Sequence, residues 1–411
     1  MTEAAAAEAL PSLSAFGLLR ANRAFRLLWL ARLVSFLGDS LGLVALILYV
    51  ADRSGTGAAV GLLLLAGDFA PTLVGPLAGA LADRLHRRRV MLACEVLQGF
   101  VVAAIVATTP PLAWLLPLVA VRAALATTFQ PASRSALPDL VADADLERAN
   151  ALLGFGTWGL DAAGPLLAAL LVPLLRVRGL LAFDAVSFFL AVPFLLRLPA
   201  LGPAPREAAS TLRADVATGL RFVWDHRFVR VLVLGFAGIV AVGAVDDVAL
   251  VLFAKGALGG GDRLASVLYG GAGLGMLAGF LALARGRFGL TARLALVAGF
   301  VATNAATSLT GATRIAAVAV LAQVVRGLGI SLVEVGHNVA IARHVPAHLR
   351  GRVFANLYAA LGVATGLAYV VGGRLVDATT PRAVLVVSGL LGLGVTAVLA
   401  WRLREPVEEA A

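Results

Sequence analysis

The chain has 411 residues, of which 60% are apolar and only 14% are charged. An ordinary soluble domain carries about a quarter charged residues, so this composition excludes a water-soluble fold. The net charge of +10 is spread over segments that alternate with apolar runs, which argues against a nucleic-acid-binding surface.

Twelve apolar runs follow one another along the chain. A helix needs roughly 20 mostly apolar residues to cross a hydrocarbon core of about 30 Å, and each run is long enough. The runs are too long and too continuously apolar for β-barrel strands, so we expect an all-α membrane protein. The expected spans are 24–50, 58–82, 90–109, 112–132, 149–174, 180–198, 229–254, 264–284, 291–311, 315–338, 353–376 and 383–402.

The first run follows Arg20 and Arg23, as the apolar part of a signal peptide would. It is longer than 25 residues and contains Asp39, so we expect it to be retained as the first helix. The single cysteine, Cys94, lies inside the third span, where we expect a small core residue. One cysteine excludes a disulfide framework and a cysteine-based metal cage.

Basic residues indicate the orientation. With the N-terminus in the cytoplasm, the cytoplasmic segments and adjoining helix ends hold 23 of the 34 Lys and Arg residues, the outer segments hold 8, and 3 lie within spans. This positive-inside pattern predicts an inner (plasma) membrane protein with both termini in the cytoplasm. The longest polar stretch, 199–227, is expected to be a cytoplasmic linker with an interfacial helix through Leu220 and Trp224.

An internal repeat divides the chain. Segment Arg26–Leu30 matches Arg230–Leu234 at an offset of 204 residues, and Arg122 matches Arg326 at the same offset. Further short matches recur in the same order at nearly this offset. We therefore expect two pseudo-symmetric six-helix bundles, at 1–198 and 228–411, with a binding site between them near the membrane midplane.

A motif lies between the second and third spans. Residues 79–89 resemble the G-x-x-x-D-R-x-G-R-R pattern of the major facilitator superfamily, although His86 stands where that family has Gly. The matching residues are Gly79, Asp83, Arg84, Arg87 and Arg88. The resemblance implies a latch that closes the cytoplasmic side when a carrier opens outward, with Arg134, Arg148 or the helix start near Arg352 as partners of Asp83. The alternative is a positive-inside cluster without a latch.

Other segments are similar to the drug:proton antiporter branch that includes macrolide-efflux and enterobactin-type exporters. The helix 5 motif of exporters is represented by Gly164 and Pro165, followed by alanines where the family has glycines. The resemblance implies a major facilitator fold in which helices 1, 2, 4, 5, 7, 8, 10 and 11 line a central cavity. The segments that carry it are Phe25–Trp29, Ser35–Asp39, Gln130–Arg134, Leu137–Val141, Ala149–Leu152 and Phe183–Phe189.

Ionisable residues inside the spans are candidates for proton coupling or substrate binding, because a charge at the bilayer centre is costly without a partner or a cavity. Burial favours the protonated form of a carboxyl group and a nearby cation favours its ionised form, so an acid beside Arg122 or Arg326 is suited to proton coupling. The candidates are Asp39, Asp68, Arg122, Asp161, Asp246, Asp247, Arg326 and Glu334.

Each candidate has a structural alternative. Asp39 is the leading proton or cation site, or else a fixed ion pair with Arg32 or Arg122. Asp161 selects the substrate or pairs with Arg122, and Asp68 is functional or satisfies backbone freed by Pro71.

Asp246 and Asp247 are about 100° apart on a helix and are not expected to face one point, so we expect one of them to be functional. Glu334 is a site residue or a solvated residue at the cytoplasmic mouth, and Arg122 and Arg326 contact the substrate or serve as counter-ions. Asp184 is expected to be structural. Trp158, Tyr269 and Tyr358 either form a wall for a cation or fill helix contacts.

Taken together, these features predict a secondary carrier that works by alternating access and exports a lipophilic or cationic small molecule in exchange for protons. Six acids against two bases among the candidates favour a cationic substrate or a proton load. No phosphate-binding loop or metal-ligand spacing is present, so we expect no ATP-driven pump, enzyme, cofactor or metal site. The alternatives are a symporter, an exporter of an anionic siderophore-like metabolite held by the arginines, and a non-transporting membrane sensor or assembly partner. We expect a monomer in the lipid bilayer.

Overall fold

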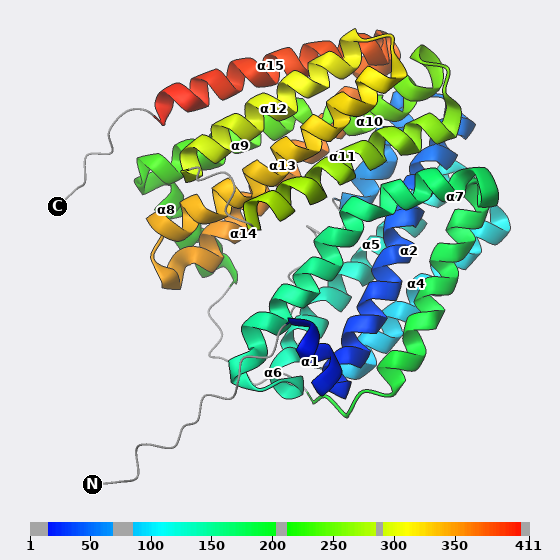
Figure 1. The fold of residues 1–411 in the computed structure, drawn as a ribbon, viewed down its shortest axis with the longest axis vertical. Helices are drawn as coiled ribbons and strands as arrows, with labels where there is room; N and C mark the ends of the chain where they lie inside the picture. Colours follow the sequence, from blue (N-terminus) through cyan, green and yellow to red (C-terminus); the bar gives the residue numbers. More distant parts are fainter. Residues whose placement is uncertain (1–14, 69–84, 203–211, 285–290, 404–411) are drawn as a thin grey trace.

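The computed structural model describes residues 15–68, 85–202, 212–284 and 291–403, and the regular elements in these ranges are helices (Figure 1). The helix Gly57–Asp68 follows α2 and carries no label. The labelled elements are α1 (Ala15–Ala21), α2 (Arg23–Ser54), α4 (Arg87–Thr108), α5 (Leu112–Ser135), α6 (Leu137–Leu140), η1 (Asp143–Asp145), α7 (Leu146–Leu196), α8 (Leu212–Asp225), α9 (Arg227–Gly243), α10 (Val245–Leu252), the π-helical η2 (Phe253–Ala257), α11 (Gly261–Ala284), α12 (Ala292–Ala312), α13 (Ala316–His344), α14 (Ala347–Ala378) and α15 (Pro381–Arg402).

Within the described ranges, ten helices are long and apolar enough to cross a membrane. Most predicted spans agree with these helices to within a few residues, as for 90–109 against α4 and 291–311 against α12. The all-α prediction is therefore confirmed for the described chain. Of the second predicted span, only the part within Gly57–Asp68 is described.

Two places show how the predicted spans relate to irregular backbone. The predicted spans 149–174 and 180–198 lie in α7 on either side of Arg176 (φ 56°, ψ 172°), where the chain leaves helical geometry and reverses direction in Figure 1. A positive φ is uncommon for a non-glycine residue, and here it lies in the predicted gap between the two spans. The predicted span 229–254 lies within the apolar helical stretch Arg227–Ala257, in which α9 ends at Gly243 and α10 begins at Val245.

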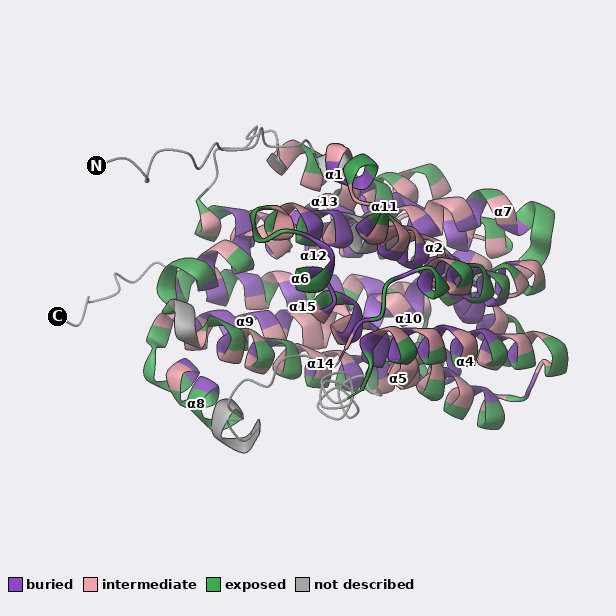
Figure 2. Ribbon diagram, turned by 90° about the horizontal axis from the view of Figure 1, so that it is seen from below, coloured by how far each residue is buried: buried purple, intermediate pink, exposed green. Residues whose placement is uncertain are grey.

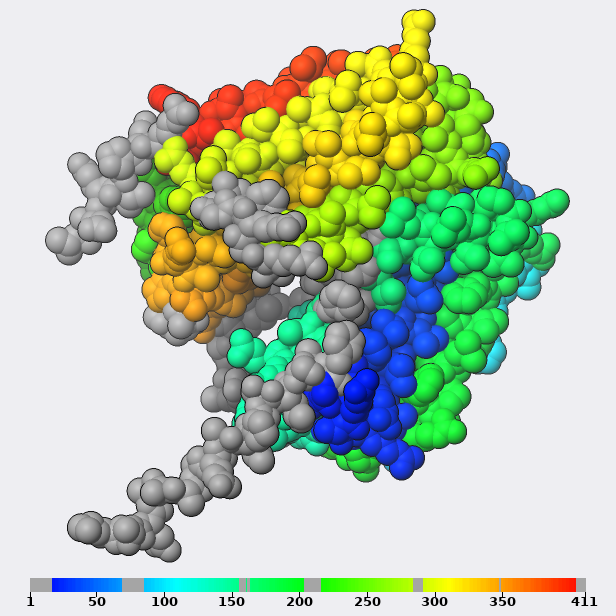
Figure 3. Space-filling model, in the orientation of Figure 1, coloured from blue at the N-terminus to red at the C-terminus, as the bar shows by residue number. Residues whose placement is uncertain are grey.

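Three apolar clusters show how the helices are grouped. One cluster, with Leu28 and Met91, joins the starts of α2 and α4, the end of α5 and both ends of α7. Another, with Leu232 and Leu357, joins α9, α12, α13 and α14. A third cluster contains residues of both groups, among them Leu46. The two groups thus share a core at one end of the molecule. Figure 3 shows the surface hollowed between them on the side where α1, α6 and α8 lie.

The surface of the helix groups is apolar. Leu174 is 77% exposed and Trp114 is 70% exposed, whereas the polar side chains of Gln323 and His337 are fully buried. Figure 2 shows exposed residues along the outward faces of the helices and buried residues between them. This arrangement suits a protein whose outer surface meets lipid. The helix predicted in the linker is present as α8, with Leu220 and Trp224 exposed.

Candidate functional site

A cavity of about 830 Å³ lies among α9, α10, α12, α13 and α14 and is also lined by Asp68. Both charged and aromatic side chains reach its wall, which is the mixture expected of a pocket that binds an organic molecule. The predicted site residues that line it are Asp68, Asp246, Asp247, Arg326 and Glu334. The aromatic residues that line it are Phe236, Phe300, Tyr358 and Tyr369.

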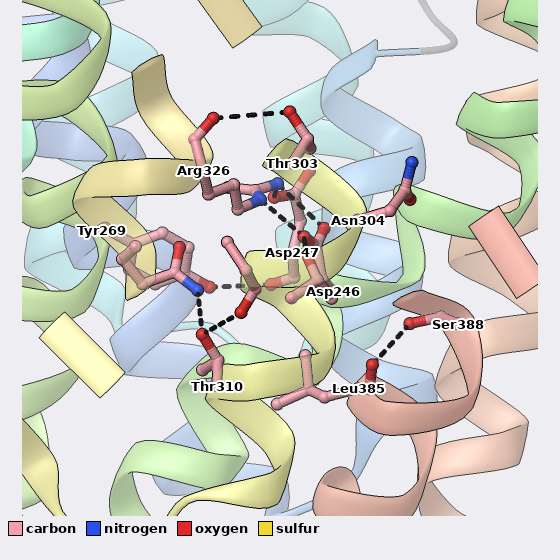
Figure 4. Close-up of polar contacts among 12 residues, drawn as sticks. Asp246, Asp247, Tyr269, Thr303, Asn304, Thr310, Arg326, Leu385 and Ser388 are labelled. Atoms are coloured by element: carbon pink, nitrogen blue, oxygen red, sulfur yellow. Dashed lines mark hydrogen bonds and ion pairs between the residues drawn. The ribbon is translucent and has the colours of Figure 1, made fainter. Parts of the chain in front are cut away.

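Arg326 of α13 forms the centre of the polar wall (Figure 4). Its Nε lies 2.7 Å from Oδ2 of Asp246, and a terminal nitrogen donates to Oδ1 of Asp246 at 2.9 Å and to Oδ1 of Asp247 at 3.2 Å. The hydroxyl of Thr307 donates to Asp246 at 3.2 Å, and Asp246 is only 3% exposed. The positive charge of Arg326 is therefore fully engaged by two carboxylates.

The expectation that Asp246 and Asp247 do not face one point was wrong. Both residues lie in the first turn of α10, directly after the break at Ala244, and both reach the same guanidinium group. The planar fork of Arg326 offers several donors in different directions, so two carboxylates about 100° apart on one helix can bind it together. Tyr269 of α11 holds the same turn by donating its hydroxyl to the carbonyl oxygen of Asp247 at 2.7 Å.

Glu334 lies about two turns further along α13 than Arg326 and lines the same cavity, with its side chain 24% exposed. Within the described chain, the basic group at ion-pair distance from Glu334 is the imidazole of His337, at 3.9 Å. Nδ1 of His337 lies 3.0 Å from the carbonyl oxygen of Val333 and must donate to it, so Nε2 of a neutral ring bears no proton. Glu334 thus faces the cavity without an arginine or lysine partner in the described ranges.

Asp68 and the aromatic residues complete the cavity. Asp68, at the end of the Gly57–Asp68 helix, accepts a hydrogen bond from the hydroxyl of Tyr369 at 3.0 Å. The ring of His337 packs against Phe236 and, edge to face, against Tyr358, with centroid distances of 5.3 and 6.4 Å. Aromatic faces and carboxylates together stabilise organic cations.

A second polar centre lies in the first helix group. Arg122 of α5 forms an ion pair with Asp39 of α2 and lies 3.6 Å from Asp184 of α7, and its guanidinium stands over the ring of Phe188 at 5.9 Å. Arg122 and Arg326, which match in the sequence repeat, therefore both bind buried or half-buried carboxylates, Arg122 those of α2 and α7 and Arg326 those of α10. The ion pair between Asp39 and Arg122 is one of the two structural alternatives given above for Asp39.

Sequence reasoning missed Glu95 of α4 and His337 of α13. Glu95 is 0% exposed, although it lies in the middle of an apolar run, where a charged residue is rare enough to be noticed. His337 gave no such signal, since a lone histidine at a helix end is usual.

The cytoplasmic motif is described in part. Gly79, Asp83 and Arg84 lie outside the described residues, so the predicted latch stays a prediction. Arg87 is buried, pairs with Asp139, and donates from Nε to the carbonyl oxygen of Gly202 at 2.7 Å. Arg88 donates to the carbonyl oxygen of Leu196 at 2.5 Å. Both arginines thus tie the start of α4 to neighbouring segments of the same helix group.

Gly164 of α7 allows a close helix contact, because a Cβ atom there would lie 2.2 Å from Cβ of Ser40 on α2. Pro165 follows it inside the helix. The side chains of Asp161 and Trp158 lie outside the described residues, so their predicted roles stay predictions.

Comparison with known proteins gives consistent matches. Residues 13–411 match the model of a family described as transmembrane secretion effector. The multidrug efflux pump Tap of Mycolicibacterium fortuitum is 28% identical over 409 residues, which cover 92% of this chain and 96% of Tap. Macrolide efflux protein A of Streptococcus pyogenes is 21% identical over 216 residues, 51% of this chain and 53% of that protein. The crystal structure of the nucleoside transporter NupG has a similar fold, with a TM-score of 0.77 at 13% identity over 93% of this chain and 100% of that chain.

Proposed function

Because the chain belongs to the transmembrane secretion effector family of major facilitator transporters, we propose that it exports lipophilic organic cations in exchange for protons by alternating access. Its relatives include a multidrug efflux pump and a macrolide efflux protein, so the chain is a multi-pass membrane transporter rather than an enzyme. The observation that carries the substrate class is the carboxylate of Glu334, which lines an aromatic cavity without an arginine or lysine partner in the described chain.

The proposed topology has twelve crossings in two six-helix halves, 1–198 and 228–411, joined by the cytoplasmic linker 199–227. The break at Arg176 supports two crossings by α7, and the predicted span 58–82 extends the Gly57–Asp68 helix. The repeat at 204 residues supports the division into halves. We place both chain ends in the cytoplasm, because the cytoplasmic segments then hold 23 Lys and Arg residues and the outer segments hold 8.

In this topology, the outer side of the molecule is closed. Lys255 of η2 pairs with Asp52 of α2 and lies 2.5 Å from Asp262 of α11. The carboxylate of Asp377, at the end of α14, accepts hydrogen bonds from the backbone N–H groups of Gly57 at 2.6 Å and Ala58 at 3.0 Å.

Glycines bring the same helices close together on the outer side. A Cβ atom at Gly61 would lie 2.3 Å from the carbonyl oxygen of Tyr369, and one at Gly373 would lie 2.6 Å from that of Gly57. Small residues of this kind let helix backbones approach in a membrane. The hollow on the opposite side then faces the cytoplasm, as an exporter requires when it takes up its cargo.

The charges of the cavity favour a cation over an anion. An anionic metabolite would have to displace Asp246 and Asp247 from Arg326, and this would leave two carboxylates buried without a counter-ion. A cation can instead pair with the carboxylate of Glu334 and lie against the rings of Phe236 and Tyr358. Export of an anionic siderophore-like molecule is therefore the less favoured alternative.

Proteoliposomes provide the test. With the lumen acidified, the purified protein is expected to accumulate the lipophilic cation tetraphenylphosphonium, and collapse of the pH gradient is expected to stop accumulation. Glu334→Gln should weaken the apparent affinity about tenfold or more, since a contact to a charged group contributes about 1.5–3 kcal/mol and tenfold is about 1.4 kcal/mol. Glu147→Gln, at an exposed residue of α7, is the matched control.

Three results would contradict the proposal. Unchanged affinity in Glu334→Gln removes this carboxylate from the binding site. Accumulation that requires an acidic exterior instead of an acidic lumen would indicate symport. The absence of flux for every compound in a broad panel of drugs and metabolites would favour the sensor alternative.

A further inference from the structure

Glu95 is a buried carboxyl group that lies apart from the cavity. It lies in the middle of α4, is 0% exposed, and is not among the residues that line the cavity. Neither of its carboxylate oxygens accepts a hydrogen bond within the described chain. An ionised carboxylate buried without a partner is strongly unfavourable, so the group is either protonated or balanced by nearby charge.

The groups around Glu95 come from each helix packed against it. Arg32 and Asp39 lie on α2, with the Ser35 hydroxyl between them, and Asp184 lies on α7. On α5, Arg122 contacts Asp39 and Asp184, and Arg134 interacts electrostatically with Arg32.

The helices are in close contact at this cluster. A Cβ atom at Gly42 of α2 would lie 2.1 Å from Oδ2 of Asp184, and one at Gly38 would lie 1.8 Å from Oγ of Ser187. Glu95 and Asp184 are fully buried in this tightly packed interior, whereas the side chain of Asp39 is 24% exposed.

The arginines of this interior are already engaged. Arg122 serves both Asp39 and Asp184, while Arg32 donates to the hydroxyl of Ser133 and to the side-chain oxygen of Gln130. Because Arg134 is exposed to solvent, three carboxyl groups face two guanidinium groups in the interior. One proton on the cluster neutralises these groups, and loss of that proton leaves one negative charge in a largely buried site.

The second half has no such acid. At the repeat offset of 204 residues, Glu95 corresponds to Gly299 of α12, where a Cβ atom would lie 2.6 Å from the carbonyl oxygen of Gly329. That position serves close helix packing in the second half, whereas the first half carries a carboxyl group there. A buried acid at this position of the repeat is therefore a property of the first half alone.

We propose that Glu95, with Asp39 and Asp184, holds the exchanged proton inside the first half, apart from the cation cavity of the second half. The inference rests on the proposed proton exchange. In each cycle one carboxylate of the cluster takes a proton from water and returns it to water, so that only an O–H bond forms and breaks. The cation and the proton then occupy different sites, and their exchange is coupled through the movement of the helices that carry them.

Purified full-length Glu95→Gln tests the proposal, because the amide has the shape of the acid but carries no exchangeable proton of this kind. Three quantities are measured with tetraphenylphosphonium: binding in detergent, proton release on binding in weakly buffered solution, and pH-driven uptake in proteoliposomes. The variant is expected to bind within about threefold of the wild type, to lose proton release, and to lose pH-driven uptake at least tenfold. Probe counterflow, which needs no net proton movement, should persist.

Controls separate a proton site from a structural role. Glu95→Asp, still titratable, should recover part of the pH-driven uptake, and Cys94→Ala, at the neighbouring residue, should behave as the wild type. Infrared difference spectra between acidic and alkaline buffer should show a carboxyl band that is lost in Glu95→Gln.

Wild-type proton release in Glu95→Gln, a carboxyl band that never titrates, or loss of probe binding together with counterflow would each overturn the inference. Wild-type protein that binds the probe and shows counterflow, but whose net uptake does not respond to the pH gradient, would instead refute the proposed exchange itself.

Discussion

Replacement of Asp377 by Ala is expected to open the outer side of the molecule. The carboxylate of Asp377, at the end of α14, accepts the backbone N–H groups of Gly57 and Ala58, in the first turn of the Gly57–Asp68 helix. It therefore acts as an N-cap that is supplied by the other helix group. This cap is present only while the two groups touch at that end, so its loss destabilises the closed arrangement rather than the fold.

The expected size of the effect follows from capping energetics. Truncation of an N-cap costs about 0.5–2 kcal/mol. Asp377 is exposed, so we take about 1 kcal/mol to allow for solvent screening. A change of about 1 kcal/mol shifts a two-state equilibrium about fivefold.

Spin labels at Ser54 and Thr379, two exposed residues at the outer ends of α2 and α14, report the separation directly after Cys94 is replaced by Ala. The population with the longer distance is expected to rise about fivefold in Asp377→Ala and less in Asp377→Asn, which keeps one acceptor oxygen. Asp143→Ala, at an exposed acid on the opposite side, should leave the distribution unchanged. The same distribution in Asp377→Ala and in the wild type would refute the reasoning.

Two other substitutions test the polar centre and the helix contact. Arg326→Gln leaves Asp246 buried without a cation, and we expect a loss of about 3–5 kcal/mol, seen as a lower midpoint of thermal unfolding in detergent, which Asp246→Asn in the same chain partly restores. Gly164→Val should lower the midpoint of thermal unfolding, because overpacking against Ser40 costs about 1–3 kcal/mol of stability. Gly154→Ala should not lower it, because nothing lies within 4 Å of the added Cβ. Equal midpoints for Arg326→Gln and the wild type, or for the two glycine variants, would contradict these expectations.

Sequence reasoning found the spans because each is a long apolar run bounded by charges, and it found the family because motif residues survive in the first half. The family model over residues 13–411 and the efflux relatives confirm that resemblance. The reversal at Arg176 lies in the predicted gap between the spans 149–174 and 180–198. The sequence did not show the interruption between α9 and α10, because a single glycine in a span rarely ends a helix.

For the candidate site, the sequence identified the charges but not their partners. Arg326 and Asp246 are 80 positions apart, and only the packing of α10 against neighbouring helices decides that they meet. The same holds for Arg122 and Asp184, where Asp184 was expected to be structural and lies at 3.6 Å from the guanidinium. Glu95 lies in the middle of the apolar run of α4, and only the structure shows that it is buried near Asp39 and Asp184.

The apolar cluster that both helix groups share opposes separation of the groups at this end of the molecule. Leu46, Leu63, Val248 and Tyr369 are nearly fully buried within it. Separation of the groups at this end would wet these side chains, at about 25 cal/mol for each Å² of apolar surface exposed. Under the proposed orientation, this cost favours the arrangement that faces the cell interior, where cargo is found. Binding of the cargo or the proton would have to supply the free energy that separates the groups at this end.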